Sequence, residues 1–125
     1  MTMKALLSTL VLATALFAAP VYAACPYPKA PDKVPDGNTA ALEEMLATQK
    51  TVKQFDTEIA AYQTCLETEH NAALQADAAK LNDEQKAERV KVLQQKQNAA
   101  AEESLAVANR FNEQVRVYRE KNKKK

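Results

Sequence analysis

The residues with the most obvious chemical potential are Glu67 and His70, which one helical turn would separate. A Glu-x-x-His pair on a helix supplies part of the ligand set of carboxylate-bridged di-iron proteins, and the full set needs a second such motif and further inward-facing glutamates. Because His70 is the only histidine, only a homodimer could complete that set. We favour the interpretation that Glu67, Glu69 and His70 form a solvated face, so the sequence predicts no metal, cofactor or catalytic residue, and metal binding through Glu67 and His70 stays the less favoured alternative.

The two cysteines, Cys25 and Cys65, could act in redox chemistry or form a structural bond. They form no Cys-x-x-Cys motif and no βαβ pattern surrounds them, which argues against a redox nucleophile. Two cysteines in a small exported protein are typical of a disulfide. Three alternatives stay open: an intermolecular bridge, free thiols, or lipidation of Cys25. Lipidation would suit the preceding alanines, but Tyr22 stands where such sites carry an aliphatic residue.

The C-terminal end of the chain is strongly basic, and Glu120 alone opposes it. Such a segment could bind acidic lipid headgroups, polysaccharide or nucleic acid. No aromatic side chain lies among the terminal lysines to stack on bases, which disfavours nucleic acid as a partner. Cations also complement the dipole at the C-terminus of a helix, and we favour that simpler role. The candidate anion-binding residues are Arg116, Arg119, Lys121, Lys123, Lys124 and Lys125.

Residues 1–23 have the three-part pattern of a secretory signal peptide. Lys4 provides the positive start, an apolar run over residues 5–19 follows, and Val21-Tyr22-Ala23 forms a small-residue cleavage site. The run is too short for a comfortable permanent membrane anchor, so we expect no transmembrane segment in the mature protein. The sequence therefore predicts cleavage after Ala23 and an exported protein, either periplasmic or secreted.

Residues 24–38 form an extended arm. Four prolines in this segment remove backbone donors and restrict φ, which excludes a helix or a central strand. Pro35-Asp36-Gly37 predicts a turn, after which Asn38 or Thr39 could cap a helix. The four prolines of the arm are Pro26, Pro28, Pro31 and Pro35.

Two long helices are predicted beyond the arm, over about residues 39–80 and 83–121, followed by a basic tail at 122–125. Asn82 and Gln85 have the spacing of a capping box and predict the start of the second helix. Each helix carries an apolar stripe of heptad-like spacing, although the second stripe is poorer. The first stripe contains Met45, Val52, Phe55, Ile59, Tyr62, Leu66 and Ala73, and the second contains Val90, Leu93, Gln97, Ala101, Ser104, Ala108, Phe111, Val115 and Tyr118.

The predicted fold is all-α, an antiparallel two-helix hairpin of coiled-coil type whose N-terminal arm is joined to the first helix by a disulfide. Residues 40–85 hold nine acidic and three basic side chains, whereas residues 86–125 hold eleven basic and five acidic ones, so the helices attract each other side by side. The predicted facing pairs are Ala73 with Val90, Val52 with Phe111, Met45 with Tyr118, and Ile59 with Ser104 and Leu105. One continuous helix that dimerises is the open alternative.

The arm has the length that the disulfide requires. Cys25 to Asn38 spans about 40 Å at the polyproline rise, and Thr39 to Cys65 spans about 39 Å along a helix. The arm can therefore run back along the first helix to Cys65, with Tyr27 and Val34 covering part of the apolar stripe.

The pattern over about residues 25–66 also resembles a group of small exported proteobacterial proteins with no assigned function. The resemblance supports export and the pairing of the two cysteines, and it implies no activity and no site. It rests on Cys25-Pro-x-Pro, Val34-Pro-Asp-Gly-x-Thr39, Glu44-Met45, Gln49, Val52-Lys53 and Tyr62-x-x-Cys65-Leu66.

Taken together, these features predict a non-enzymatic binding or structural protein of the cell envelope that acts on an unidentified macromolecular partner or on a second copy of itself. Two helices and an arm leave apolar edges uncovered, which makes a homodimeric four-helix bundle an open option. A periplasmic holdase or stress adaptor is the main alternative, because long amphipathic helices suit transient binding of unfolded chains.

Overall fold

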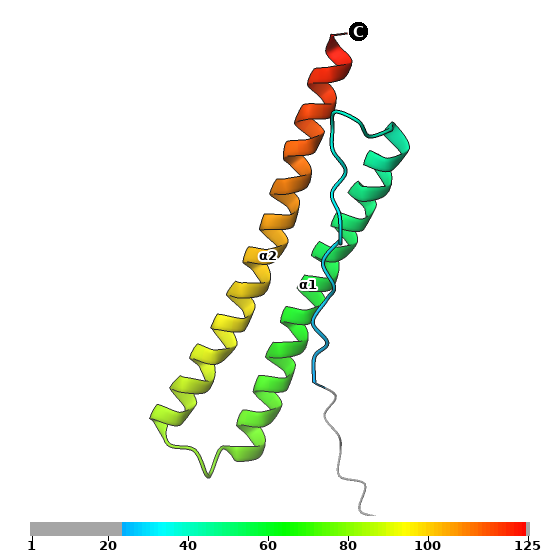
Figure 1. Cartoon of the computed structure of the whole chain (residues 1–125). Helices are drawn as coiled ribbons and strands as arrows, with labels where there is room; N and C mark the ends of the chain where they lie inside the picture. Colours follow the sequence, from blue (N-terminus) through cyan, green and yellow to red (C-terminus); the bar gives the residue numbers. More distant parts are fainter. Residues whose placement is uncertain (1–23, 125) are drawn as a thin grey trace, which may run out of the picture.

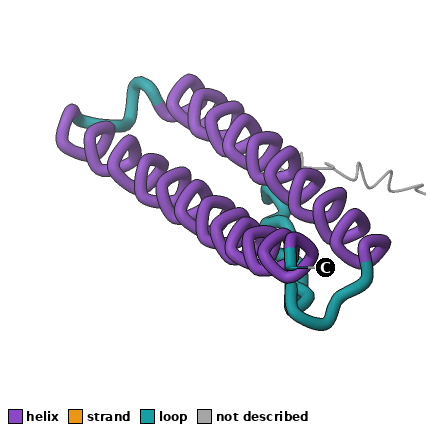
Figure 2. The backbone as a smooth tube through the Cα atoms, turned by 90° about the horizontal axis from the view of Figure 1, so that it is seen from above, coloured by secondary structure: helices purple, strands orange, loops and turns teal. Residues whose placement is uncertain are grey.

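The computed structural model describes residues 24–124 and confirms the predicted all-α hairpin. Helix α1 spans Leu42–Asp77 and helix α2 spans Asp83–Lys123, and the two run antiparallel side by side (Figure 1). Figure 2 shows the short connection at one end of the pair and the segment that leads into α1 at the other. We call these the turn end and the open end. The predicted signal peptide at residues 1–23 lies outside the described residues.

The start of α2 at the turn end forms as the sequence predicts, but α1 ends at Asp77, three residues before its predicted end. The side chain of Asn82 accepts from the backbone N–H of Gln85 at 2.8 Å, and the Gln85 side chain accepts from the Asn82 N–H at 3.0 Å. This capping box satisfies two backbone donors that the first turn of a helix otherwise leaves free. Helix α2 then continues to Lys123, two residues beyond the predicted end, so part of the expected basic tail is helical.

The predicted start of α1 is wrong by three residues. Neither Asn38 nor Thr39 caps the helix, because the N-cap is Ala41, whose side chain offers no acceptor. The backbone carbonyl of Asp36 instead accepts from the N–H groups of Thr39 and Ala40, and its carboxylate accepts from the N–H of Asn38. This local turn uses residues 36–40 and delays the helix, as competition from short polar side chains explains.

The core lies in the half of the hairpin nearer the open end. Ala100 is wholly buried and Val107 is 1% exposed. Neither belongs to the predicted stripe of α2, whose Ala101 is exposed, so that part of the predicted stripe is wrong, whereas Ser104 and Phe111 are buried as predicted. Ile59, Ser104 and Leu105 line one depression, as their predicted pairing requires, whereas Ala73 and Val90 are both exposed. The buried residues form two clusters, Phe55, Ile59, Ala100 and Val107 in one, and Ala40, Met45 and Phe111 with Val52 and Tyr118 against them in the other.

The opposite charges of the two helices produce few direct pairs. Among residues 24–124, the ion pair that joins α1 to α2 is Arg89 with Asp77, at 3.1 Å beside the turn. The other polar contacts between the helices are hydrogen bonds, such as the one that the Ser104 hydroxyl donates to Asp56 at 2.7 Å. Most charged side chains of the described helices therefore form no direct pair with the other helix, and exposed ion pairs of this kind provide little stabilisation in any case.

Candidate functional site

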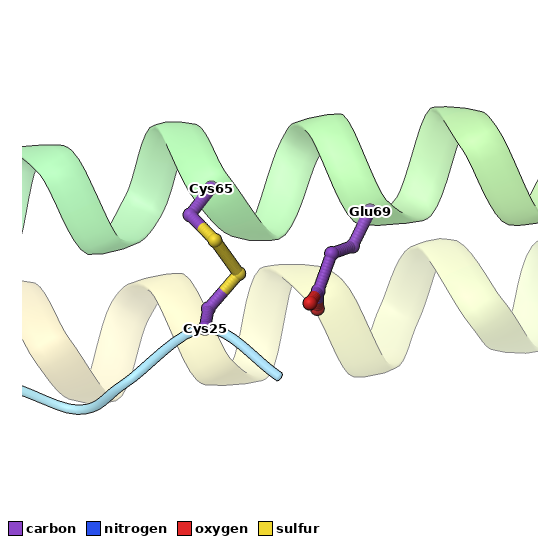
Figure 3. A group of neighbouring side chains, drawn as sticks. All are labelled: Cys25, Cys65 and Glu69. Carbon is purple, nitrogen blue, oxygen red and sulfur yellow. A yellow bond between two sulfur atoms is a disulfide. The ribbon is translucent and has the colours of Figure 1, made fainter. Parts of the chain in front are cut away.

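The arm is held on the hairpin by a disulfide between Cys25 and Cys65, as predicted (Figure 3). The two Cα atoms are 5.8 Å apart, which is an ordinary separation for such a bond. The bond joins the start of the described chain to the middle of α1. On the chain-entropy view, closing this loop stabilises the fold by about 4 kcal/mol.

Between Cys25 and Gly37 the arm contacts both helices. The Tyr27 ring packs edge-on against Tyr62 of α1, with centroids 5.0 Å apart, and its hydroxyl donates a hydrogen bond to Glu103 of α2. Ala30 packs against the buried cluster around Ile59, and Val34 against the cluster around Phe111. The arm thus lies in the groove between α1 and α2 and closes one face of the core (Figure 1).

The contact of Tyr27 with Glu103 changes the acidity of the phenol. The hydrogen bond to Glu103, with smaller contributions from burial and from the charge of the carboxylate, raises the pKa of Tyr27 from 10.0 to about 12. A phenolate at this position would face a carboxylate and lose its hydrogen bond. Tyr27 therefore stays protonated where it fastens the arm.

Gly37 marks the point where the arm leaves α2. Its N–H donates to the side-chain oxygen of Gln114 at 2.9 Å. A Cβ added at Gly37 would lie 2.2 Å from the Gln114 carbonyl oxygen and 2.7 Å from the Tyr118 nitrogen. The only glycine of the chain is thus required by close contact with the backbone of another helix.

Beyond Cys25 the same face of the hairpin carries an open groove of about 650 Å³. Glu69, one turn after Cys65 on α1, lies at the start of this groove. Its side chain extends from α1 on the same side as the disulfide (Figure 3). The groove continues from there to the turn end, where nothing from residues 24–37 covers it. Its apolar lining residues are Leu66, Ala73, Leu81, Val92 and Leu93, and its charged ones are Glu69, Asp77, Glu88, Arg89 and Lys96, with His70 beside them.

The groove carries both signs of charge. Glu69 and Asp77 lie on the wall that α1 provides, whereas the wall of α2 carries Arg89 and Lys96 together with the acidic Glu88. Arg89 already pairs with Asp77 across the groove. The remaining polar groups stand at the edges of an apolar floor, which is the composition of a binding surface for another chain.

Glu67 and His70, the less favoured metal alternative, have different surroundings. The carboxylate of Glu67 accepts from the Gln97 side chain at 2.9 Å, while His70 faces the groove. The potential metal-binding group within residues 24–124 is instead Cys25, Cys65 and Glu69, whose ligand atoms lie within 4.8 Å of one another. Both sulfurs of this group are used in the disulfide, so they offer no thiolate ligands.

The basic C-terminal residues lie on the exposed last turns of α2. Arg116 forms ion pairs with Glu113 and Glu120 on the same helix. The hydrogen bond and charge of Glu113, with that of Glu120, raise the pKa of the Arg116 guanidinium, and the same pairing lowers the pKa of Glu113. Arg116 is thus part of a helix-surface network, and the remaining cations at this end are Arg119, Lys121, Lys123 and Lys124, since Lys125 lies outside the described residues.

Comparison with known proteins identifies no family. No family model matches the sequence, and no match was found among curated proteins or solved structures. No helix within residues 24–124 has an apolar stretch long enough to cross a membrane. The site is therefore described by its own geometry alone.

The sequence did not reveal the open groove. Its residues come from the weak end of the first apolar stripe and the start of the second, and only the position of the arm leaves them uncovered. The pairing of Tyr27 with Glu103 was also missed, because the two residues lie 76 positions apart. A usable signal was present in the loss of large apolar residues after Leu66.

Proposed function

We propose that this protein is a non-enzymatic binding protein of the cell envelope that holds an extended polypeptide segment in the groove at the turn end. The observation that carries the proposal is continuity. An extended segment of the chain itself, the arm, occupies the groove near the open end, and the same groove continues past Cys25 without an occupant from residues 24–124.

The arm indicates how such a partner would bind. It places Tyr27, Ala30 and Val34 against the helices, at the three- and four-residue spacing of one side of an extended polyproline-like chain. A partner segment with apolar side chains at similar spacing could place them against Val92 and Leu93. Its polar groups would then lie near the charged walls, where Glu69 and Lys96 remain accessible.

Binding can be measured with a defined probe. The probe is a fluorescent peptide that repeats residues 24–35, with serine in place of Cys25. It would be titrated against the disulfide-bonded mature protein, in which the arm already occupies the groove near the open end. We expect saturable binding that weakens at least about tenfold in Val92→Glu, because an unpaired charge would enter the apolar floor. Ala106→Glu, on the exposed outer side of the same helix, is the matched control. Absence of binding, or equal binding by Val92→Glu, would refute the proposal.

A holdase or stress adaptor is the second candidate, and the same groove favours it. A groove with an apolar floor and walls of both charges suits many unfolded segments, since little shape is demanded of the ligand. The test is suppression of aggregation of a chemically denatured client protein at stoichiometric amounts. Failure to suppress aggregation would remove this candidate while leaving specific peptide binding intact.

Export is part of the proposal. The disulfide and the absence of a membrane-spanning helix within residues 24–124 are compatible with an exported protein outside the membrane, and the resemblance over residues 25–66 supports the same compartment. Intact mass of protein purified from the bacterial envelope would test it. We expect a chain that begins at Ala24 and gains the mass of two hydrogens on reduction, whereas a diacylglyceryl group on Cys25 would overturn the proposed arrangement.

A further inference from the structure

The face of the hairpin opposite the arm carries the three most exposed large apolar side chains of the described chain. Leu105 is 60% exposed, Leu42 is 56% exposed and Leu46 is 54% exposed. Tyr62 and Cys65 mark the arm side of α1, and Glu103 marks the arm side of α2. Since each residue turns a helix by about 100°, Leu105 lies roughly 200° round α2 from Glu103.

Two depressions follow this face. Their linings are mainly small or apolar, with Asp56 and Gln63 also in the first and Gln49 and Arg119 also in the second. The one in the middle of the hairpin measures about 270 Å³, and the one near the open end about 180 Å³. Ala60 of α1 lies in the first, across from Leu105 of α2. The other lining residues that matter here are Ala101 and Ala108 in the first depression, and Leu46, Phe111 and Val115 in the second.

We propose that this face packs against the same face of a second copy, around a two-fold axis that runs along the hairpin. The product is a four-helix bundle with both arms on the outside. Such an axis lays α1 of one copy across α2 of the other. Because Ile59 and Ser104 stand at the same height in the hairpin, Leu105 of each copy then enters the small-residue depression at Ala60 of the other.

Charge selects this axis over the alternative. Helix α1 carries seven acidic and two basic side chains, and α2 carries nine basic and seven acidic ones. The proposed axis also sets the acidic first turn of α1, with Glu43 and Glu44, beside the basic last turn of α2, with Lys121 and Lys123. A two-fold axis across the hairpin would instead place α1 on α1, with like charges opposed.

The face is large enough to form a stable dimer interface. Helix α1 contains 36 residues, which corresponds to a length of about 54 Å. A surface of that length and two helices wide exceeds the roughly 800 Å² per partner that stable interfaces bury. The interaction uses the opposite side of the hairpin from the groove at the turn end, so it goes beyond the proposed function.

Sedimentation velocity of the mature, disulfide-bonded protein over a hundredfold concentration range tests the inference. We expect a monomer–dimer equilibrium whose Kd rises at least about 100-fold in Leu105→Glu, since two charges would be buried without partners. Leu105 is exposed in the single chain, so this variant should keep its fold, which circular dichroism would verify. Ala106→Glu, exposed on the outer side of α2, should leave the Kd within about twofold of the original value.

A second variant tests the register. In Leu105→Glu with Ala60→Lys, each new glutamate would face a new lysine of the other copy, and the dimer should return to within about tenfold of the original Kd. A wild-type protein that stays monomeric, a dimer that Leu105→Glu leaves intact, or a double variant that gains nothing over Leu105→Glu would each overturn the proposed dimer. Peptide binding to monomeric Leu105→Glu would show that the groove functions independently.

Discussion

Within residues 24–124, three segments pack together near the open end, whereas two do so near the turn. The arm, α1 and α2 enclose Phe55, Ile59 and Val107, so the apolar stripe of each helix is shielded from solvent there. Between Leu66 and Ala100 the described helices bury no residue. The halves differ in two ways, since the turn end lacks the arm and its stripes carry fewer large apolar residues. Near the open end the arm supplies the third layer that completes the core.

Removal of the disulfide, which holds the arm on the core, should have the largest effect on stability. In Cys25→Ser with Cys65→Ser, we expect the free energy of unfolding to fall by about 4 kcal/mol, because the unfolded chain loses a long closed loop. Urea denaturation followed by circular dichroism measures the loss. If the variant unfolds at the same urea concentration as the parent, the bond does not hold the arm on the core.

Truncation of matched side chains compares the two halves directly. Ile59→Ala removes a side chain that is 3% exposed and should cost about 3 kcal/mol. Leu93 lies in the uncovered groove, where part of its surface already contacts water. Leu93→Ala should therefore lower the free energy of unfolding by only about 1 kcal/mol. Equal losses in thermal or urea denaturation would mean that the turn end is as well packed as the open end.

The close contact at Gly37 should have the next largest effect. A methyl group in Gly37→Ala would meet the backbone of Gln114, and the arm must shift or α2 must bend, at a cost of about 2 kcal/mol. Asn38→Ala, in the same exposed turn, serves as the control for the loss of a turn residue. Differential scanning calorimetry should show a lower Tm for Gly37→Ala and a smaller change for the control.

The smallest effect on stability is expected at alkaline pH, where the contact that Tyr27 makes for the arm is weakened. The pKa of Tyr27 is raised from 10.0 to about 12 in the fold, so its contribution to stability is complete below pH 10 and is lost as pH rises from 10 to about 12. Absorbance of the phenolate against pH should show one tyrosine that titrates late. That late titration should be absent in Tyr27→Phe, and its persistence there would assign it to another tyrosine.

The extent of sequence-based prediction differs between these regions for a physical reason. The helices, the restart at Asn82 and the extended arm follow from interactions between residues close in sequence, namely helical periodicity, a capping box and the fixed φ of proline. The disulfide was also predicted, because two cysteines in a small exported protein typically pair, and the lengths of the arm and the first helix agree with that pairing. The start of α1 was missed because the carbonyl and carboxylate of Asp36 bind the backbone groups that Asn38 or Thr39 was expected to organise.

The sequence by itself thus determined the elements, their antiparallel order and the bond that joins the arm to α1. Tertiary structure alone decided which part of the groove the arm covers, the contacts of Tyr27 with Glu103 and of Gly37 with Gln114, and the groove left open beyond Cys25. Those features depend on contacts between residues far apart in the chain. Such contacts form only when burial of apolar surface fixes the relative position of whole elements, and no local pattern records them.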